Sequence, residues 1–387
     1  MKALEFERKE ARFAAAAIAS RLKPGAGAEV GPLTLADIDP PSPLGPGWQR
    51  VSTVLSGICG SDLDSIDAKA SRYFDPLVSF PFVMGHEILG RLDDGTRVVI
   101  EPVMGHEARA MVPPFIGAAP ADGNDYGHLV TGHIQPGIQI GYCADTGGGW
   151  SEEFVAHSSQ IHTIPDDLSD DDAVMVEPLA SGIHAALRAN VQEGDTVAVI
   201  GAGTMGLCTI AALRTLTPAG KILVAAKYPH QRKIAERLGA DVVVSSDELP
   251  RAIRRMLGCS LIGEALSSGV DVTVDGIGSS ATITTAINIT RPRGRVVMLG
   301  MPGKVTVDLT ALWHRETEMV GTYTYGTETL TDGRSARTFD LAIDLAGKGG
   351  IGRLVTAHYP IEDYVEAVQH AAQAGMRGAV KVVFDFR

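Results

Sequence analysis

The chain lacks the marks of a membrane or secreted protein. No apolar run among its 387 residues approaches the roughly 20 residues that a membrane-spanning helix needs. The first residues, 1–6, contain no apolar core of the kind found in secretory signals. We therefore expect a cytoplasmic protein without a membrane partner.

Cysteine and basic residues are also scarce. The four cysteines, at positions 59, 143, 208 and 259, are too widely spaced for a disulfide framework, which favours a reducing compartment. Lysine and arginine number 34 against 46 acidic residues, so the formal net charge is −12. Because binding to a phosphate backbone relies on clustered Lys and Arg, this balance argues against a nucleic-acid partner.

The length and the patterning predict two domains. With 387 residues, 45% of them hydrophobic, the chain can bury two ordinary cores but not three. Short strand patterns bounded by turn residues predict an antiparallel, β-rich catalytic domain over 1–173, completed by 317–387. Alternating strand and helix patterns predict a doubly wound parallel sheet, the Rossmann α/β fold, over 174–316. An Ala-rich stretch at 10–22 predicts one short helix, which we interpret as decoration.

Side chains of the kind that bind zinc occur in three separated segments. Cys59 and Ser61 lie close together, His86 and Glu87 are adjacent, and Glu177 follows much later. A thiolate, an imidazole and a carboxylate are the ligands of a catalytic zinc that keeps one position open for substrate. Either glutamate can supply the third ligand. Such a zinc polarises an alcohol oxygen, and Ser61 is placed to accept the alcohol proton.

A dinucleotide site is predicted directly after the last of these residues. A strand pattern at 196–200 runs into a glycine-rich turn formed by Gly201, Ala202, Gly203, Thr204, Met205 and Gly206. Between a strand and a helix, such a turn lets the backbone approach a pyrophosphate at the helix N-terminus. Gly276 and Gly300 end later strand patterns on the same carboxyl edge, where dinucleotides lie.

The residues after the second strand of this fold favour NADP over NAD. An acidic residue about 20 positions beyond the turn would bind the ribose 2′-hydroxyl of NAD, but Ala226 stands there. Lys227, Tyr228 and Arg232 follow, and they are donors suited to a 2′-phosphate. The alternative is that these cations are ordinary solvated charges at a helix start.

These motifs resemble those of the zinc-dependent medium-chain dehydrogenases/reductases, the alcohol dehydrogenase superfamily. The resemblance is carried by Gly57-Ile58-Cys59-Gly60-Ser61-Asp62, Gly85-His86-Glu87, Glu177-Pro178-Leu179-Ala180-Ser181-Gly182-Ile183-His184 and Gly201 to Gly206. Glutamate at position 177 is similar to the sorbitol and threonine dehydrogenase branch. The resemblance implies a GroES-like catalytic domain, zinc ligands at Cys59, His86 and one of Glu87 or Glu177, and a homodimer or homotetramer. It also implies that the main chain at Gly276 and Gly300 contacts the nicotinamide half of the cofactor.

The chain departs from this family in two places. A lobe at 104–150 keeps the length of a structural-zinc lobe, but apolar residues occupy the four cysteine positions: Phe115, Ala118, Ala121 and Leu129. We therefore expect one catalytic zinc and no structural zinc, with the lobe packed hydrophobically. Where relatives often have a histidine after the Ser61 segment, this chain has Asp64, which leaves the proton path beyond Ser61 open.

The combination predicts an enzyme, a zinc-dependent oxidoreductase that transfers a hydride between a small-molecule alcohol, secondary by preference, and NADP. Two alternatives stay open at this point. One is zinc-free reduction of an activated double bond, as in an enone or quinone reductase. The other is a non-catalytic cofactor-binding protein, because a fold does not fix a function.

Overall fold

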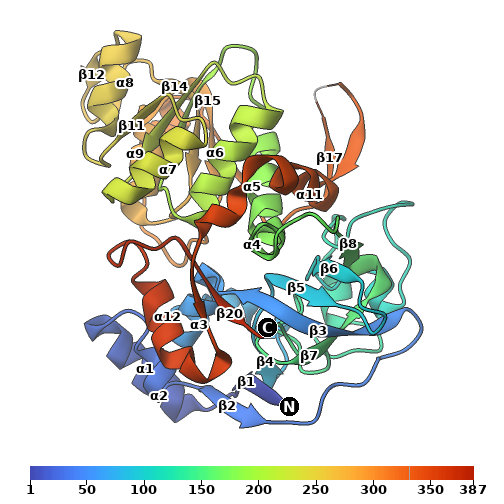
Figure 1. Ribbon diagram of the computed structural model, residues 1–387. Helices are drawn as coiled ribbons and strands as arrows, with labels where there is room; N and C mark the ends of the chain where they lie inside the picture. Colours follow the sequence, from blue (N-terminus) through green and yellow to red (C-terminus); the bar gives the residue numbers. More distant parts are fainter. Residues whose placement is uncertain (331) are drawn as a thin grey trace. The chain divides into compact units, whose positions relative to one another are not determined.

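The computed structural model describes residues 1–330 and 332–387, which form two compact units (Figure 1). One unit comprises Met1–Glu177 and Phe339–Arg387, and the other comprises Pro178–Thr338. The limits expected from the sequence, after 173 and 316, differ from these. Local sequence patterns do not show with which unit a connecting segment packs. Within the described residues, no helix combines the length and the apolar character needed to cross a membrane.

The first unit is built on antiparallel strands. Its strands are β1 (Lys2–Phe6), β2 (Leu33–Asp37), β3 (Trp48–Gly57), β4 (Phe82–Val83), β5 (Ile88–Arg91), β6 (Arg97–Ile100), β7 (Glu153–His157), β8 (Ile161–Thr163), β19 (Val355–Tyr359) and β20 (Lys381–Asp385). The larger sheet has the order β19-β20-β3-β5-β6-β8, and a smaller sheet has the order β2-β1-β4. The long strand β3 pairs antiparallel with β5, β7 and β20, so it joins the start, the middle and the end of the chain.

Helices of the first unit surround these sheets. They are α1 (Glu10–Leu22), α2 (Gly27–Val30), α3 (Gly60–Ile66), α4 (Asp170–Val174) and α12 (Tyr364–Ala372), while α5 (Val176–Arg188) and α11 (Thr338–Gly349) cross the unit limits. One apolar core contains Phe6, Phe82 and Trp150, and a second contains Val51, Ile100 and Phe154.

The helix predicted over 10–22 is confirmed as α1, but it is not decoration. The carboxylate of Asp67, just after α3, is buried and accepts hydrogen bonds from the main-chain N–H groups of Gly25 (3.0 Å) and Gly27 (3.2 Å). A Cβ atom at Gly27 would lie 2.1 Å from the carbonyl oxygen of Ile66, so only glycine permits this approach. The α1–α2 segment is therefore fixed to the end of α3.

The second unit has the predicted Rossmann architecture. Its main sheet has the order β11-β10-β9-β14-β15-β16, with all neighbours parallel. The bounds are β9 (Thr196–Ile200), β10 (Lys221–Ala225), β11 (Val242–Val244), β14 (Val270–Asp275), β15 (Thr290–Met298) and β16 (Glu318–Gly321). The sequence of β9 is apolar at almost every position, as expected of a parallel strand buried on both faces.

The remaining elements of this unit connect or flank the sheet. The helices are α6 (Thr204–Leu216), α7 (Pro229–Arg237), α8 (Leu249–Leu257), α9 (Ser280–Ile289) and α10 (Thr310–His314). Two short antiparallel pairs also occur, β12 (Leu261–Ile262) with β13 (Ala265–Leu266) and β17 (Thr327–Thr329) with β18 (Ser335–Arg337). The helices alternate with the parallel strands, which is the crossover pattern that a parallel sheet requires.

The lobe at 104–150 is organised by a buried cation. Apolar residues of the lobe do pack as expected, since Leu129 belongs to one apolar core and Ile140 to the other, although Phe115 is 48% exposed. In addition, Arg109 is 1% exposed and its guanidinium donates to main-chain carbonyls at 2.8 to 3.5 Å. The acceptors are the carbonyl oxygens of Met104, Thr131, Ile134, Gln135 and Gly137. A planar guanidinium with five N–H donors can hold several carbonyls in this way.

We expect Arg109→Leu to lower the free energy of unfolding of the protein by about 3 kcal/mol or more, because it leaves several buried carbonyls without donors. Urea unfolding followed by tryptophan fluorescence measures this change. Arg72→Leu is the control, since Arg72 is exposed and its replacement should change stability by less than about 0.5 kcal/mol. Equal stabilities of the two variants would contradict the role given to Arg109.

Candidate active site

Cys59 is held at the start of helix α3. It is the N-cap residue, in extended conformation, and its main-chain N–H donates to Oδ2 of Asp62 at 2.9 Å. A carboxylate three residues into a helix commonly satisfies the N–H of the capping residue in this way. The thiol is therefore fixed between the end of β3 and the first turn of α3, where Ser61 also lies.

The imidazole of His86 lies beside the other oxygen of the same carboxylate. Nδ1 of His86 is 3.3 Å from Oδ1 of Asp62, but it has no well-aligned hydrogen-bond partner, and both residues are almost fully buried. The Cys59 side chain also interacts with this imidazole. Burial lowers the pKa of His86, but Asp62 and Cys59 outweigh burial and hold that pKa well above its usual value.

Glu87 lies in a buried ion pair. Both of its carboxylate oxygens accept from Nζ of Lys381, at 2.6 and 2.5 Å, and the two side chains are only 1% and 3% exposed. Burial lowers the pKa of Lys381, but Glu87 outweighs this, and the pKa of Lys381 lies above its usual value. The charges of Cys59 and Glu177 also act on this ammonium group, so all three acidic groups lie near it.

The described side chains do not form a ready-made metal cluster. Over 1–330 and 332–387, no three or more His, Cys, Asp or Glu side chains are grouped so that they could hold a metal ion. The chemistry of the donors nevertheless fits zinc, because the Cys59 thiol lies next to the His86 imidazole, and Nδ1 of that imidazole faces a carboxylate, as is common for zinc-bound histidines. Glu177 is also largely buried, at 8% exposure.

Tyr142 reaches this group of residues from the lobe, and the sequence did not single it out. Its hydroxyl donates to Oδ1 of Asp62 at 3.2 Å and lies 3.4 Å from Oγ of Ser65. Burial, followed by the charge of Asp62, raises the pKa of Tyr142 well above its usual range, and Ser61 also interacts with the phenol.

In the second unit, the glycine-rich turn lies between β9 and α6. Gly201 has a φ of +99°, and a Cβ atom at Gly206 would lie 2.0 Å from the carbonyl oxygen of Gly201. Gly203 is the N-cap of α6 and no side chain caps this end, while a Cβ atom at Gly203 would meet nothing within 4 Å. Thr204 and Met205 open the helix. The turn therefore has the open helix N-terminus that a pyrophosphate needs.

Gly276 and Gly300 lie at the same carboxyl edge of the sheet. A carboxylate oxygen of Asp275 accepts from the N–H groups of Ile277 (2.9 Å) and Gly278 (3.2 Å), which fixes the turn after β14. A Cβ atom at Gly300 would lie 2.3 Å from the main chain of Ile277, so the turns after β14 and β15 can pack this closely only because residue 300 is glycine.

The two cations after β10, Lys227 and Arg232, differ in their contacts and in their exposure. Arg232 donates from Nε to the carbonyl of Ala226 at 2.9 Å and from Nη2 to that of Lys227 at 3.4 Å, so it braces the turn. Lys227 is exposed, with its Nζ 5.4 Å from the ring centre of Tyr228. Ala226 is fully buried. Lys227 is thus the more accessible of the two cations.

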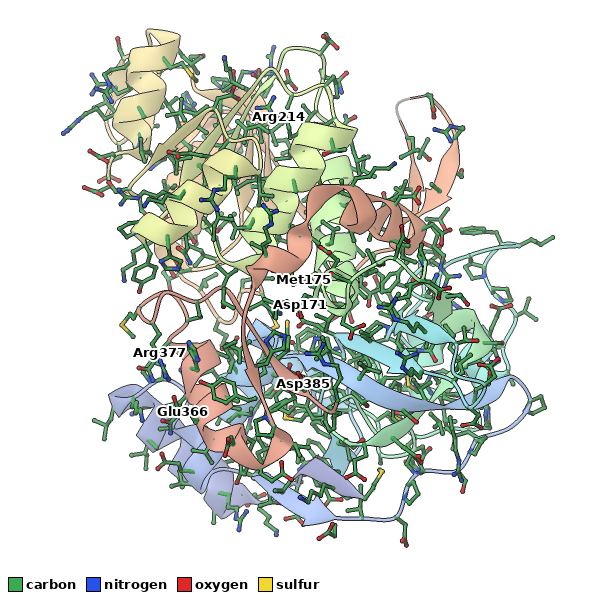
Figure 2. All side chains as sticks on the ribbon, viewed as in Figure 1. Asp171, Met175, Arg214, Glu366, Arg377 and Asp385 are labelled. Carbon is green, nitrogen blue, oxygen red and sulfur yellow. The ribbon has the colours of Figure 1, made fainter. Side chains whose placement is uncertain are left out.

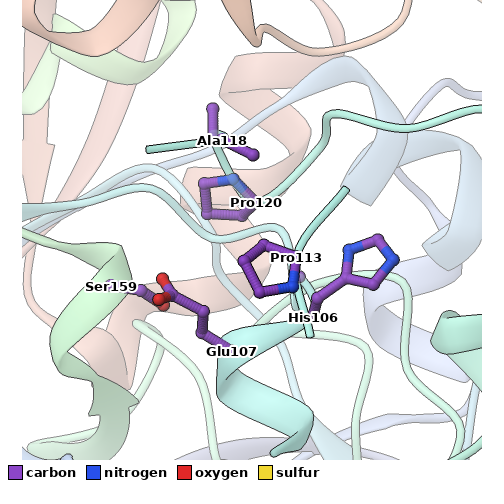
Figure 3. A pocket seen from close by; sticks show the side chains of 8 residues that line it. His106, Glu107, Pro113, Ala118, Pro120 and Ser159 are labelled. Atoms are coloured by element: carbon purple, nitrogen blue, oxygen red, sulfur yellow. The ribbon is translucent and has the colours of Figure 1, made fainter. Parts of the chain in front are cut away.

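The lobe also contributes to a small pocket (Figure 3). It is lined by Gly105, His106, Glu107, Pro113, Ala118, Ala119, Pro120 and Ser159. None of the predicted ligands or cofactor residues is among them, so this pocket is not the proposed active site.

Two family models match the chain. The model for the alcohol dehydrogenase GroES-like domain matches residues 45–166, and the model for zinc-binding dehydrogenases matches residues 204–336. Together they match more than half of the chain. The chain belongs to the alcohol dehydrogenase superfamily of medium-chain dehydrogenases/reductases, and it is an oxidoreductase of the alcohol dehydrogenase class.

Individual proteins agree with this assignment. The L-idonate 5-dehydrogenase of Vitis vinifera is 28% identical over 373 residues, which cover 88% of this chain and 89% of that protein. A sorbitol dehydrogenase of Arabidopsis thaliana is 28% identical over 351 residues, with the same coverage of both chains. The solved structure of 2R,3R-butanediol dehydrogenase from Bacillus subtilis matches the fold with a TM-score of 0.72 at 21% identity, covering 100% of this chain and 99% of that one. The fold and the family predicted from the sequence are confirmed.

We expect Lys381→Met to lower the free energy of unfolding by about 3 to 5 kcal/mol, because it leaves the carboxylate of Glu87 buried and unpaired. Adding Glu87→Gln should recover much of this loss, since the remaining pair is then neutral. Urea unfolding of the two variants measures both steps.

Arg377→Met provides the control for this prediction. Arg377 pairs with Glu366 at 2.6 Å on the surface (Figure 2), and its loss should cost no more than about 1 kcal/mol. A Lys381→Met variant as stable as this control would contradict a structural role for the buried pair.

Proposed function

We propose that the protein is a zinc-dependent oxidoreductase that transfers a hydride between an alcohol, secondary by preference, and NADP. The observation that carries this proposal is that the side chains of Cys59 and His86 meet beside the buried carboxylate of Asp62. A thiol beside an imidazole, with a carboxylate that faces the imidazole and bonds the main chain of the cysteine, matches the donor set and the outer-sphere support of a catalytic zinc.

Glu177 is the third ligand in this proposal. Glu87 and Glu177 both influence Lys381, and both oxygens of Glu87 accept hydrogen bonds from its ammonium group. Moving Glu87 onto a metal would leave Lys381 buried without this partner, which is costly. We therefore assign the third position to Glu177, which is largely buried and whose charge also acts on Lys381.

The residues of the proposed site would divide the work of the reaction. When bound, zinc would supply a Lewis acid that stabilises the deprotonated alcohol. Ser61, in the first turn of α3, would accept the alcohol proton on its oxygen and release its own hydroxyl proton toward water. Asp62 orients the imidazole of His86 and the main chain of Cys59. The turn from Gly201 to Gly206 would hold the pyrophosphate of NADP, the cofactor that would supply hydride-transfer chemistry.

The cofactor preference follows from the residues after β10. No carboxylate stands at Ala226 to repel a 2′-phosphate, and the side chain of Lys227 is exposed, whereas the guanidinium of Arg232 is engaged by main-chain carbonyls. A lysine and a phosphate form a charge-assisted interaction. We therefore assign the 2′-phosphate contact to Lys227, with Tyr228 beside it.

Assembly into a homodimer or homotetramer belongs to the same proposal. Strand β16 forms one edge of the Rossmann sheet, and an edge strand offers unpaired main-chain groups to a second copy. Light scattering of the purified protein gives the molecular mass in solution.

Cys59→Ala should remove bound zinc and reduce turnover by several orders of magnitude, because the soft thiolate ligand is lost. The variant should still bind NADPH, since the glycine-rich turn lies in the other unit. Atomic absorption, alcohol oxidation and NADPH fluorescence measure the three properties. Cys259→Ala, at a half-buried cysteine of the second unit, is the matched control and should retain zinc and turnover. Full activity of Cys59→Ala would rule out the metal mechanism.

Lys227→Ala should weaken NADP binding about tenfold and leave NAD binding nearly unchanged, because only NADP carries the 2′-phosphate. Dissociation constants for both nucleotides measure the difference. Lys233→Ala, an exposed lysine of α7, is the control and should affect neither nucleotide. Equal losses for NADP and NAD would place the 2′-phosphate elsewhere.

A further inference from the structure

The carboxylate of Asp62 is shared by three parts of the chain. Its Oδ2 accepts from the N–H of Cys59, while its Oδ1 lies 3.2 Å from the hydroxyl of Tyr142 and 3.3 Å from Nδ1 of His86. Asp62 is fully buried, so its orientation depends on these partners and not on water. The same carboxylate therefore contacts the main chain of one proposed zinc ligand and the imidazole of the other.

Tyr142 is the partner that comes from the lobe. Its ring packs against Phe82, with ring centres 5.2 Å apart, and lies 5.9 Å from the ring of His86. The hydroxyl is further enclosed by Ser65, whose own Oγ donates to the carbonyl of Ser61 at 2.9 Å. The phenol is thus held from both sides, and its hydroxyl points at a carboxylate that faces His86.

We propose that Tyr142 is a positioning residue of the active site, which orients Asp62 and through it the zinc ligands Cys59 and His86. The inference rests on the proposed function, because it concerns the same metal site. A buried carboxylate oxygen that loses one of its donors is freer to turn away from the imidazole. Partners that orient a metal-bound histidine typically change metal affinity by about 10- to 100-fold when they are removed.

The inference is tested by the zinc affinity of the full chain, which needs no substrate. Metal-free protein is titrated with zinc in competition with a chromogenic chelator. Tyr142→Phe keeps the ring and removes only the hydroxyl, and we expect about tenfold weaker zinc binding. Tyr126→Phe is the matched control, because Tyr126 belongs to the same lobe and is 54% exposed; its affinity should equal that of the unmodified chain.

A double-mutant cycle shows whether Tyr142 acts through Asp62. If it does, Tyr142→Phe should have no further effect on zinc affinity once Asp62→Ala is present, because either change removes the contact between the Tyr142 hydroxyl and the Asp62 carboxylate. A loss that adds in full to that of Asp62→Ala overturns the inference. Should Asp62→Ala fail to fold, the comparison of Tyr142→Phe with Tyr126→Phe decides the matter.

The outcomes separate this inference from the proposed function. Tight zinc binding that is unchanged in Tyr142→Phe overturns the inference and leaves the proposed function intact. A chain that binds no zinc with Tyr142 in place overturns the proposed function and the inference with it. Far-ultraviolet circular dichroism checks that Tyr142→Phe is folded, so that weaker binding is not a consequence of unfolding.

Discussion

The buried pair of Glu87 and Lys381 is the constraint on which the first unit depends. Glu87 lies just before β5 and Lys381 begins β20, so the pair joins residues 294 positions apart in the sequence. Burying either charge without the other is costly, so β20 must pack where Lys381 can reach Glu87. A Cβ atom at Gly57 would lie 1.9 Å from Oε2 of Glu87, so the carboxylate fits beside β3 only because residue 57 is glycine. Cys59 follows this glycine by two residues, and its position therefore depends on the packing of the ion pair against β3.

A second feature of the structure is that two buried arginines each donate hydrogen bonds to several main-chain carbonyls. In the lobe, Arg109 collects carbonyls that no strand or helix satisfies. In the second unit, Arg315 donates to the carbonyls of Leu266, at the end of β13, Ser268, and Thr290, at the start of β15, at 2.5 to 3.0 Å. An unpaired carbonyl inside a protein costs free energy, and a fork of N–H donors can satisfy several at once. The hydrogen bonds of Arg109 therefore hold separate segments of the lobe together.

The sequence predicted the regular parts of the structure and missed the long-range contacts. The strand at 196–200 and the helix at 10–22 were predicted with their observed limits, because their sequence patterns are local. Arg109, Tyr142 and the partner of Glu87 were missed, since each acts on residues far away along the chain. The partner of Glu87 could have been predicted, because Lys381 interrupts an apolar strand pattern, and a lysine buried in a strand needs an acidic partner. No comparable pattern marks Tyr142, because a tyrosine in a segment without periodicity is indistinguishable from an ordinary core residue.

The two ends of helix α3 show why the site extends beyond its ligands. Its first turn is fixed by Asp62, which bonds the Cys59 main chain and faces Tyr142 of the lobe. Its last turn is fixed by Asp67, which bonds the segment after α1. A helix of seven residues has little stability of its own, so these contacts set its direction. Ser61 lies in the first turn of this helix, and its placement therefore depends on contacts that come from the lobe at one end of α3 and from the N-terminal helices at the other.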